Sequence, residues 1–297
     1  MRHRAEPHGR RGLLLGRVLL GLAAFPFLAF LAWLWFVWPP PAWYRWAWPR
    51  STAFMNMREA ESGADSVGRT YTPVPLASIS SDVKYAVLVA EDHRFYEHHG
   101  IDYLELRRAL GYRRDSFAFS NPRDRDDLRK AIIAAYDRRN RIRGASTITQ
   151  QLAKNLYLSS SRSPLRKVKE AVLAWRLEYW LGKERILELY LNVVELGPGV
   201  WGVEAASQKY FRRSASRLTL PQAAMLAGTL PFPLHSNPAY RPARMRSRQA
   251  LIIRRLRGEL AEVPRVVEVP EAPVIAMPDS VPMPVIMPDA VMDTTRD

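Results

Sequence analysis

The sequence predicts a mostly α-helical domain that follows an N-terminal transmembrane helix. The first observation is a run of 21 residues without a charge, Val18 to Trp38, near the start of the chain. The second is a series of segments between residues 82 and 256 with apolar residues at helical spacing, separated by turn and capping residues. We therefore expect a basic N-terminus (1–12), a transmembrane helix (13–38), a connector (39–81), a helical domain (82–260) and a Pro-rich tail (261–297).

A transmembrane helix over residues 13–38 is predicted because about 20 apolar residues cross a bilayer. The basic residues of segment 1–12 favour a cytoplasmic N-terminus, and the tryptophans between Trp33 and Trp48 are typical of the outer interface. The helical domain is then expected on the outer, periplasmic side of the cytoplasmic membrane. The alternative is a cleaved signal peptide, but the apolar run is long and ends in Pro and Trp instead of small residues.

The segments that flank the helical domain are predicted to be irregular. The connector begins at Pro39, and its residues 49–81 are rich in Ser, Gly, Pro and Thr, so we expect them to be weakly structured or to form a short strand pair around Tyr71. Residues 262–297 carry seven Pro, seven acidic and two basic residues. This composition predicts an extended, disordered tail.

The composition restricts the chemistry and the partners. The chain has no cysteine, which excludes disulfides, thiolate nucleophiles and zinc–thiolate sites. Its net charge of +15 predicts an anionic partner such as a membrane surface or a phosphorylated substrate. No zinc finger or aromatic RNA-binding signature is present, and we expect no nucleic-acid partner.

A helix is predicted over residues 82–96, with Tyr85, Leu88 and Val89 on its buried side, and it carries Glu91 and Asp92 in its last turns. A helix pair is expected over residues 103–143, which hold 12 Arg or Lys and 6 Asp or Glu among apolar residues. Two interpretations of this pair stay open. It is a solvated basic face, or it is a segment inserted partly into the membrane surface.

The next helix is predicted to begin at a capping box formed by Thr147 and Gln150. Ile148, Leu152 and Leu156 then mark an apolar face. The helix also carries a polar cluster beside this face, formed by Gln151, Lys154 and Asn155.

A further helix is predicted to begin with Ser163 as its cap and Pro164 in its first turn. Arg166 and Lys167 lie one turn before Glu170, so two cations and a carboxylate share one patch. The buried face is expected to consist of Leu165, Val168, Val172, Trp175 and Tyr179.

Three more helices follow, over residues 183–192, 219–230 and 241–256. The last is basic and amphipathic, and a solvated face is the favoured interpretation of its arginines. Among the aromatic residues, Trp175, Tyr190 and Trp201 are predicted to belong to the core instead of forming sugar-binding platforms.

Four motifs together resemble the peptidoglycan glycosyltransferase family, whose lysozyme-like domain polymerises the cell-wall glycan. They are residues 91–100 (EDHRFYEHHG), 144–151 (GASTITQQ), 166–170 (RKVKE) and 183–192 (KERILELYLN). They occur in the family's order over about half of the chain. The chain resembles the monofunctional branch of this family, which is expected to polymerise glycan without cross-linking peptides.

The resemblance implies the reaction and the role of each residue. The enzyme would transfer a lipid-linked glycan chain onto the 4-hydroxyl of lipid-linked GlcNAc-MurNAc-pentapeptide, with inversion and release of undecaprenyl pyrophosphate. Glu91 would be the general base, and Glu170 would assist near the donor pyrophosphate or hold its cationic neighbours. Lys154, Arg166 and Lys167 match the family's donor-phosphate cluster. The positions that shape the cleft are Asp92, Phe95, His98, Ser146, Thr147, Gln151 and Asn155.

The resemblance also implies a divalent cation, magnesium, although the spacing of residues gives no ligand set for it. Zinc is not expected from His93, His98 and His99, because two of them are adjacent and no thiolate exists. Expected partners are the lipid-linked precursor, the growing strand, the membrane and proteins of a cell-wall synthesis complex.

Two other functions remain as alternatives. A lytic glycosidase of the same fold class would cleave the glycan with one acid, but it has no pyrophosphate to bind with Lys154, Arg166 and Lys167. A non-catalytic scaffold would not need both Glu91 and Glu170. Glu170 alone also fits a simple ion pair with Arg166, which contributes only ~0.3–0.5 kcal/mol.

Overall fold

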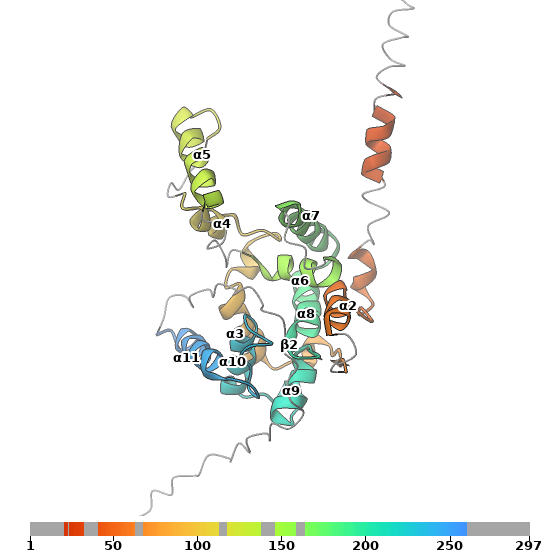
Figure 1. Ribbon diagram of the computed structural model, residues 1–297, viewed down its shortest axis with the longest axis vertical. Coiled ribbons are helices and arrows are strands. Elements are labelled where there is room, and N and C mark those ends of the chain that lie inside the picture. The colour runs from red at the N-terminus through yellow and green to blue at the C-terminus, as the bar shows by residue number, and fades with distance from the viewer. Residues whose placement is uncertain are drawn as a thin grey trace, which may run out of the picture. The chain divides into compact units, whose positions relative to one another are not determined.

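The computed structural model (Figure 1) describes residues 21–22, 24–32, 41–62, 68–112, 118–137, 146–158 and 164–259. The chain divides into two compact units, Met1–Trp46 and Ala47–Asp297. In the first unit, residues 21–22 and 24–32 are helical and η1 spans Pro41–Arg45. Most of the predicted membrane span and all of the tail 261–297 lie outside the described residues. Within those described, no helix combines the length and the apolar character needed to cross a membrane.

The second unit is mostly helical, as predicted. One group of helices packs together from distant parts of the chain: α3 (Ser81–Glu91), α10 (Leu220–Thr229) and α11 (Ala243–Leu256). The second group consists of α6 (Ile148–Tyr157), α7 (Pro164–Trp180) and α8 (Lys183–Val193), with α2 (Ala53–Ser62) packed against α6. The helix α2 lies in the segment that we predicted as a connector, so this part of the prediction was wrong.

The remaining elements are short. The helices α4 (Tyr103–Leu110) and α5 (Pro122–Asp137) contact each other and form the predicted helix pair. The helix α9 spans Val203–Phe211. Single 3-10 turns are η3 (Leu76–Ser78), η4 (Phe95–Glu97) and η5 (Ala215–Arg217).

A small sheet joins the start of the second unit to the segment that follows α8. Its strand order is β1-β3-β2, in which β1 (Thr70–Tyr71) runs parallel to β3 (Val200–Trp201) and β2 (Glu195–Gly197) runs antiparallel to it. The strand predicted around Tyr71 therefore exists, but its partner is distant in sequence. Gly202 has a φ of 83°, and a Cβ there would lie 2.3 Å from the carbonyl oxygen of Asn192. Only glycine allows this close approach of the sheet to α8.

The predicted helix signals were largely correct. Capping boxes begin both α6 and α10, with Thr147 and Thr219 as the capping residues. Ile148, Leu152 and Leu156 are buried, which confirms the apolar face of α6. The helix α3 ends at Glu91, five residues before the predicted end at residue 96, and a separate turn follows it.

The predicted buried face of α7 was wrong. Val168, Trp175 and Tyr179 are 55–64% exposed, and Val172 is 36% exposed. A second stripe faces the core instead, formed by Leu173, Ala174, Leu177 and Leu181. The sequence of this helix carries two apolar stripes, and the helical period alone does not indicate which one meets the neighbouring helices.

The buried side of α3 also differs from the prediction. Tyr85 is 61% exposed, and Leu88 and Val89 are only partly buried. The residues that pack against α10 and α11 are smaller: Val83, Ala86, Val87 and Ala90. Tyr190 and Trp201 are buried core residues as expected, whereas Trp175 is not.

The orientation of α7 predicts that two truncations destabilise the protein to different extents. Leu177→Ala should lower the free energy of unfolding by about 2–5 kcal/mol, because it opens a cavity at a fully buried position. Trp175→Ala should lower it by about 0.5 kcal/mol or less, because the ring lies at the surface. Denaturant unfolding followed by circular dichroism measures both. A larger loss from the tryptophan variant would contradict this orientation.

Candidate active site

Glu91 is the last residue of α3, and two side chains from other helices fix its carboxylate. Gln151 of α6 donates from Nε2 to Glu91 Oε2 at 3.1 Å. Arg248 of α11 donates from Nη2 to Glu91 Oε1 at 3.3 Å and to the carbonyl oxygen of Ala90 at 2.8 Å. The Glu91 side chain keeps 15% of its surface exposed. The carboxylate is thus held at both oxygens and still reaches solvent.

The helix α6 is fixed at its N-terminus next to this carboxylate. Thr147 accepts from the N–H of Gln150 at 3.1 Å and donates from Oγ1 to the carbonyl oxygen of Gly100 at 2.6 Å. The buried Tyr190 of α8 donates to Gln151 Oε1 at 2.9 Å, which orients the amide group of Gln151 toward Glu91. The predicted site residues Thr147 and Gln151 therefore have different roles. One anchors the helix, and the other contacts the predicted base.

Asp92 and His98 form a buried bracket between the end of α3 and the start of α6. Asp92 Oδ2 accepts from the N–H of Ile148 at 2.9 Å, and His98 Nε2 lies 3.0 and 3.1 Å from the two carboxylate oxygens. Asp92 is 1% exposed and His98 is 7% exposed. Their role in the structure is to fix the backbone beside Glu91.

Glu170 belongs to a second cluster. Its two carboxylate oxygens accept from Arg166 Nη1 at 3.0 Å and from Lys167 Nζ at 2.9 Å. Lys167 Nζ also donates to Ser146 Oγ at 2.7 Å. Glu170 is 4% exposed, and the Lys167 side chain is 53% exposed. Each oxygen of the carboxylate is therefore paired with a cation, and one of these cations faces solvent.

The helix α6 connects these two clusters. Its second turn carries Gln151, which contacts Glu91, and Ser146 lies directly before its capping residue and contacts Lys167. Lys154, one turn beyond Gln151, is partly exposed, and its Nζ lies 5.3 Å from the ring centroid of Phe54. Within the described part of the chain, Lys154 forms no ion pair with a carboxylate.

Two of the predicted residues, Phe95 and Asn155, are buried. Phe95 is 1% exposed, and Lys183 Nζ lies 4.3 Å from the centroid of its ring. Asn155 is 7% exposed. The structure places both in the protein interior and gives neither a contact with Glu91 or Glu170 among the described interactions.

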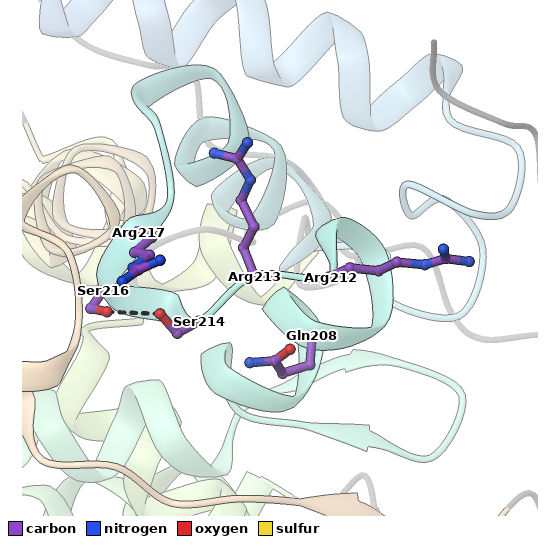
Figure 2. A pocket seen from close by; sticks show the side chains of 6 residues that line it. All are labelled: Gln208, Arg212, Arg213, Ser214, Ser216 and Arg217. Carbon is purple, nitrogen blue, oxygen red and sulfur yellow. Dashed lines mark hydrogen bonds between the residues drawn. The ribbon is translucent and has the colours of Figure 1, made fainter. Parts of the chain in front are cut away.

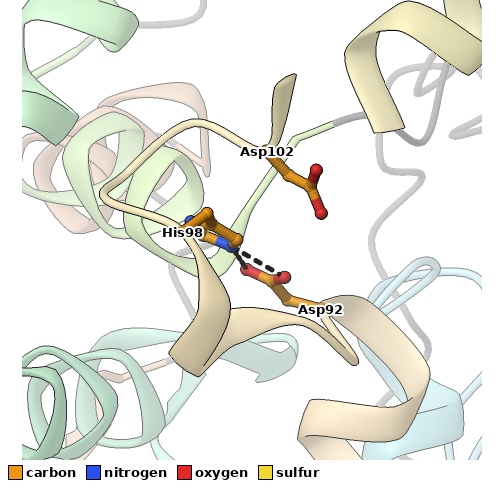
Figure 3. A group of neighbouring side chains, drawn as sticks. All are labelled: Asp92, His98 and Asp102. Atoms are coloured by element: carbon orange, nitrogen blue, oxygen red, sulfur yellow. Dashed lines mark hydrogen bonds and ion pairs between the residues drawn. The ribbon is translucent and has the colours of Figure 1, made fainter. Parts of the chain in front are cut away.

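Asp92, His98 and Asp102 are close enough to hold a metal ion, since one ligand atom from each lies within 4.8 Å of the others. Figure 3 shows His98 joined to Asp92 alone. Among the residues that the structure describes, Asp102 Oδ2 and His98 Nδ1 have no hydrogen-bond partner. However, Asp92 already accepts from Ile148 and His98, and all three side chains are at most 7% exposed. The cluster does not suit a hydrated magnesium ion that contacts a pyrophosphate.

A separate hollow lies at the end of α9 and beside η5. Its lining consists of Gln208, Arg212, Arg213, Ser214, Ser216 and Arg217. Figure 2 shows that Arg212 extends to the side opposite Arg217. None of the predicted site residues lines this hollow, so it is not part of the candidate active site.

Two residues of the site, Tyr190 and Arg248, were not predicted from the sequence. Tyr190 was assigned to the core, which is correct, but its hydroxyl also orients Gln151. Arg248 was assigned to a solvated basic face, which was wrong because it is 3% exposed. A signal was present in the sequence: Arg248 lies between Met245 and Ile252 at the spacing of a buried stripe.

The arrangement combines an oriented carboxylate with nearby cations. A carboxylate with free lone pairs can accept a proton from a hydroxyl group. Arg166, Lys167 and Lys154 can stabilise negative charge that develops on a leaving phosphate. The helix α6 links the two groups, because Gln151 contacts Glu91 and Ser146, next to the helix, contacts Lys167.

Comparison with known proteins gives a consistent result. A family model described as Transglycosylase matches residues 60–257. Two similar proteins are both named biosynthetic peptidoglycan transglycosylase. One, from Bordetella pertussis, is 42% identical over 227 residues, which cover 75% of this chain and 84% of the relative. The other, from Methylobacillus flagellatus, is 38% identical over 256 residues, covering 86% and 97% of the two chains.

The bracket around Asp92 predicts a stability effect that does not depend on metal. Asp92→Asn should lower the free energy of unfolding by about 1–3 kcal/mol, because a neutral amide presents only one acceptor oxygen where the carboxylate presents two charged ones. Thermal unfolding of the wild-type protein should be the same with and without EDTA. A lower unfolding midpoint in EDTA would show that the cluster holds an ion.

Proposed function

The chain belongs to the transglycosylase family and is a peptidoglycan glycosyltransferase, and from this premise we propose how its two carboxylate clusters divide the reaction. Glu91 is the general base. Lys154, Arg166 and Lys167 bind the pyrophosphate of the donor. The observation that carries this proposal is the fixed Glu91 carboxylate, which α6 joins to the cationic cluster.

The base acts on the acceptor, a lipid-linked GlcNAc-MurNAc-pentapeptide. Glu91 takes the proton from its 4-hydroxyl while the oxygen attacks the anomeric carbon of the lipid-linked glycan chain. The bond to the undecaprenyl pyrophosphate breaks on the opposite face, so the configuration inverts. Gln151 and Arg248 each contact one oxygen of the carboxylate, and a carboxylate offers about four lone-pair sites in all.

The cations act on the leaving group. Pyrophosphate gains negative charge as the glycosidic bond breaks, and Lys154, Arg166 and Lys167 neutralise it. Arg166 and Lys167 each pair with one oxygen of the Glu170 carboxylate, so the proposed role of Glu170 is to hold these cations in place. It thereby serves the second of the two roles that the resemblance implied. Ser146 contacts Lys167 in this cluster, and Thr147 anchors the start of α6. The proposed role of Asp92, Phe95, His98 and Asn155 is to shape the cleft.

The proposed setting is the periplasmic side of the cytoplasmic membrane, with residues 13–38 as the anchor. The lipid tails of both substrates require the site to work at a membrane surface. Contacts with other cell-wall synthesis proteins are part of this proposal. A requirement for magnesium remains a prediction from the family.

A lytic function is disfavoured by the surroundings of Glu91. A lytic enzyme needs a protonated carboxyl group, which an apolar pocket favours. Here a buried guanidinium lies next to the carboxylate and favours its ionised form. The cations around Glu170 would also have no phosphate to bind in a glycosidase.

Replacing Glu91 tests the general base. Glu91→Gln should lower polymerisation of labelled lipid-linked disaccharide by at least about 10²-fold, because the amide cannot accept the proton. Folding should be preserved. Glu61→Gln is the matched control, since that side chain is 48% exposed and pairs with Arg58. Near wild-type polymerisation by the Glu91 variant would show that another residue is the base.

Replacing Lys154 tests donor binding. Lys154→Ala should lower kcat/KM for the lipid-linked substrate by about 10²-fold, because one charged contact with the leaving group is lost. Lys209→Ala, at an exposed position of α9, is the control. Unchanged kinetics across substrate concentrations would remove Lys154 from the donor site. Purified glycan strands incubated in parallel should stay uncut, and their shortening would instead support the lytic alternative.

A further inference from the structure

Arg248 occupies a position where the fold calls for an apolar residue. The core-facing stripe of α11 consists of Met245, Arg248 and Ile252, and these side chains are 0%, 3% and 0% exposed. Neighbouring arginines on the same helix, such as Arg244 and Arg246, are exposed. A guanidinium cannot lose its charge under ordinary conditions. Its burial therefore destabilises the protein unless a partner compensates for the charge.

The compensating partner is the proposed catalytic base. Arg248 Nη2 contacts Glu91 Oε1 at 3.3 Å and the carbonyl oxygen of Ala90 at 2.8 Å. One donor group thus reaches both the backbone at the end of α3 and the carboxylate of its last residue. The ion pair joins residues that are 157 positions apart in the sequence.

The packing of α11 against α10 and α3 brings Arg248 to this place. Gly228 of α10 allows the close approach, because a Cβ there would lie 2.9 Å from the carbonyl oxygen of Met245. At the start of α11, the N–H of Met245 donates to Ser236 Oγ at 3.0 Å. The helix is therefore fixed one turn before Arg248, and the guanidinium enters the site from a rigid element.

We propose that Arg248 is a positioning residue that holds Glu91 ionised and oriented toward the acceptor hydroxyl. This inference rests on the proposed function of Glu91 as the base. The surrounding elements contribute Asp92 from the end of α3, which pairs with His98, and Gln151 and Lys154 from α6. Among the described contacts of Glu91, Arg248 supplies the positive charge, and Gln151 supplies a neutral donor.

The test is the pH dependence of polymerisation by Arg248→Met and Arg248→Lys in the full-length protein. Arg248→Met should lower kcat by about 10²-fold and change KM by less than about threefold. The acid limb of its kcat profile should move by about one unit to higher pH, because the carboxylate loses a neighbouring cation. A purely structural role would lower the active fraction without moving this limb.

Arg248→Lys should keep the acid limb of the wild type, because it keeps a positive charge. Its kcat should still be reduced, because a flexible ammonium group does not reproduce the geometry of the guanidinium. If Arg248→Met does not fold, as judged by circular dichroism, the kcat of Arg248→Lys tests whether Arg248 positions Glu91. Arg246→Met, at an exposed position of the same helix, is the matched control and should have wild-type kinetics.

The outcomes separate this inference from the proposed function. If Glu91→Gln is inactive but Arg248→Met has the wild-type kcat and pH profile, Arg248 does not position the base, and the base assignment stands. Wild-type kcat in Arg248→Lys together with an unchanged acid limb in a folded Arg248→Met would also overturn the proposal. If Glu91→Gln is active, both assignments fail. In the Glu91→Gln background, Arg248→Met should lower the residual rate by less than about threefold.

Discussion

The site depends on how one helix end is held. The helix α3 ends at Glu91, and the next residue, Asp92, is tied to the first residue of α6 through the N–H of Ile148. Gln151 and Arg248 then hold the Glu91 carboxylate from two sides. A carboxylate at a free helix end would sample many rotamers. Here three separate contacts restrict it, and this restriction is what a general base requires.

The two carboxylates have opposite surroundings, and this separates their roles. Glu91 keeps part of its surface accessible and has one ion pair described, with Arg248. Glu170 is buried, and both of its oxygens accept from cations. A buried carboxylate whose two oxygens already contact cations is poorly accessible to a substrate hydroxyl. It is suited to arranging positive charge, which is the requirement on the side of a pyrophosphate leaving group.

The exposed face of α7 shows where periodicity fails as a guide. Its sequence has apolar residues on two sides, and burial selects Leu173 and Leu177 while Trp175 and Tyr179 remain at the surface. Glu170 is buried on the same side of α7 as Leu173 and Leu177. Lys167 contacts both Glu170 and Ser146, so this side of α7 faces the start of α6. The polar cluster and the apolar stripe of this helix therefore constrain each other.

The sequence by itself determined the helical class, the capping box of α6, and the grouping of Arg166, Lys167 and Glu170. These features are local, since residues three or four positions apart on a helix meet whatever surrounds them. It also indicated Glu91, through motifs that resemble a family. Tertiary structure decided which stripe of α7 is buried, that β1 pairs with β3, and that Arg248 reaches Glu91 from α11. These features join distant segments, and an arginine on an amphipathic helix has the same local pattern whether it meets water or a buried carboxylate.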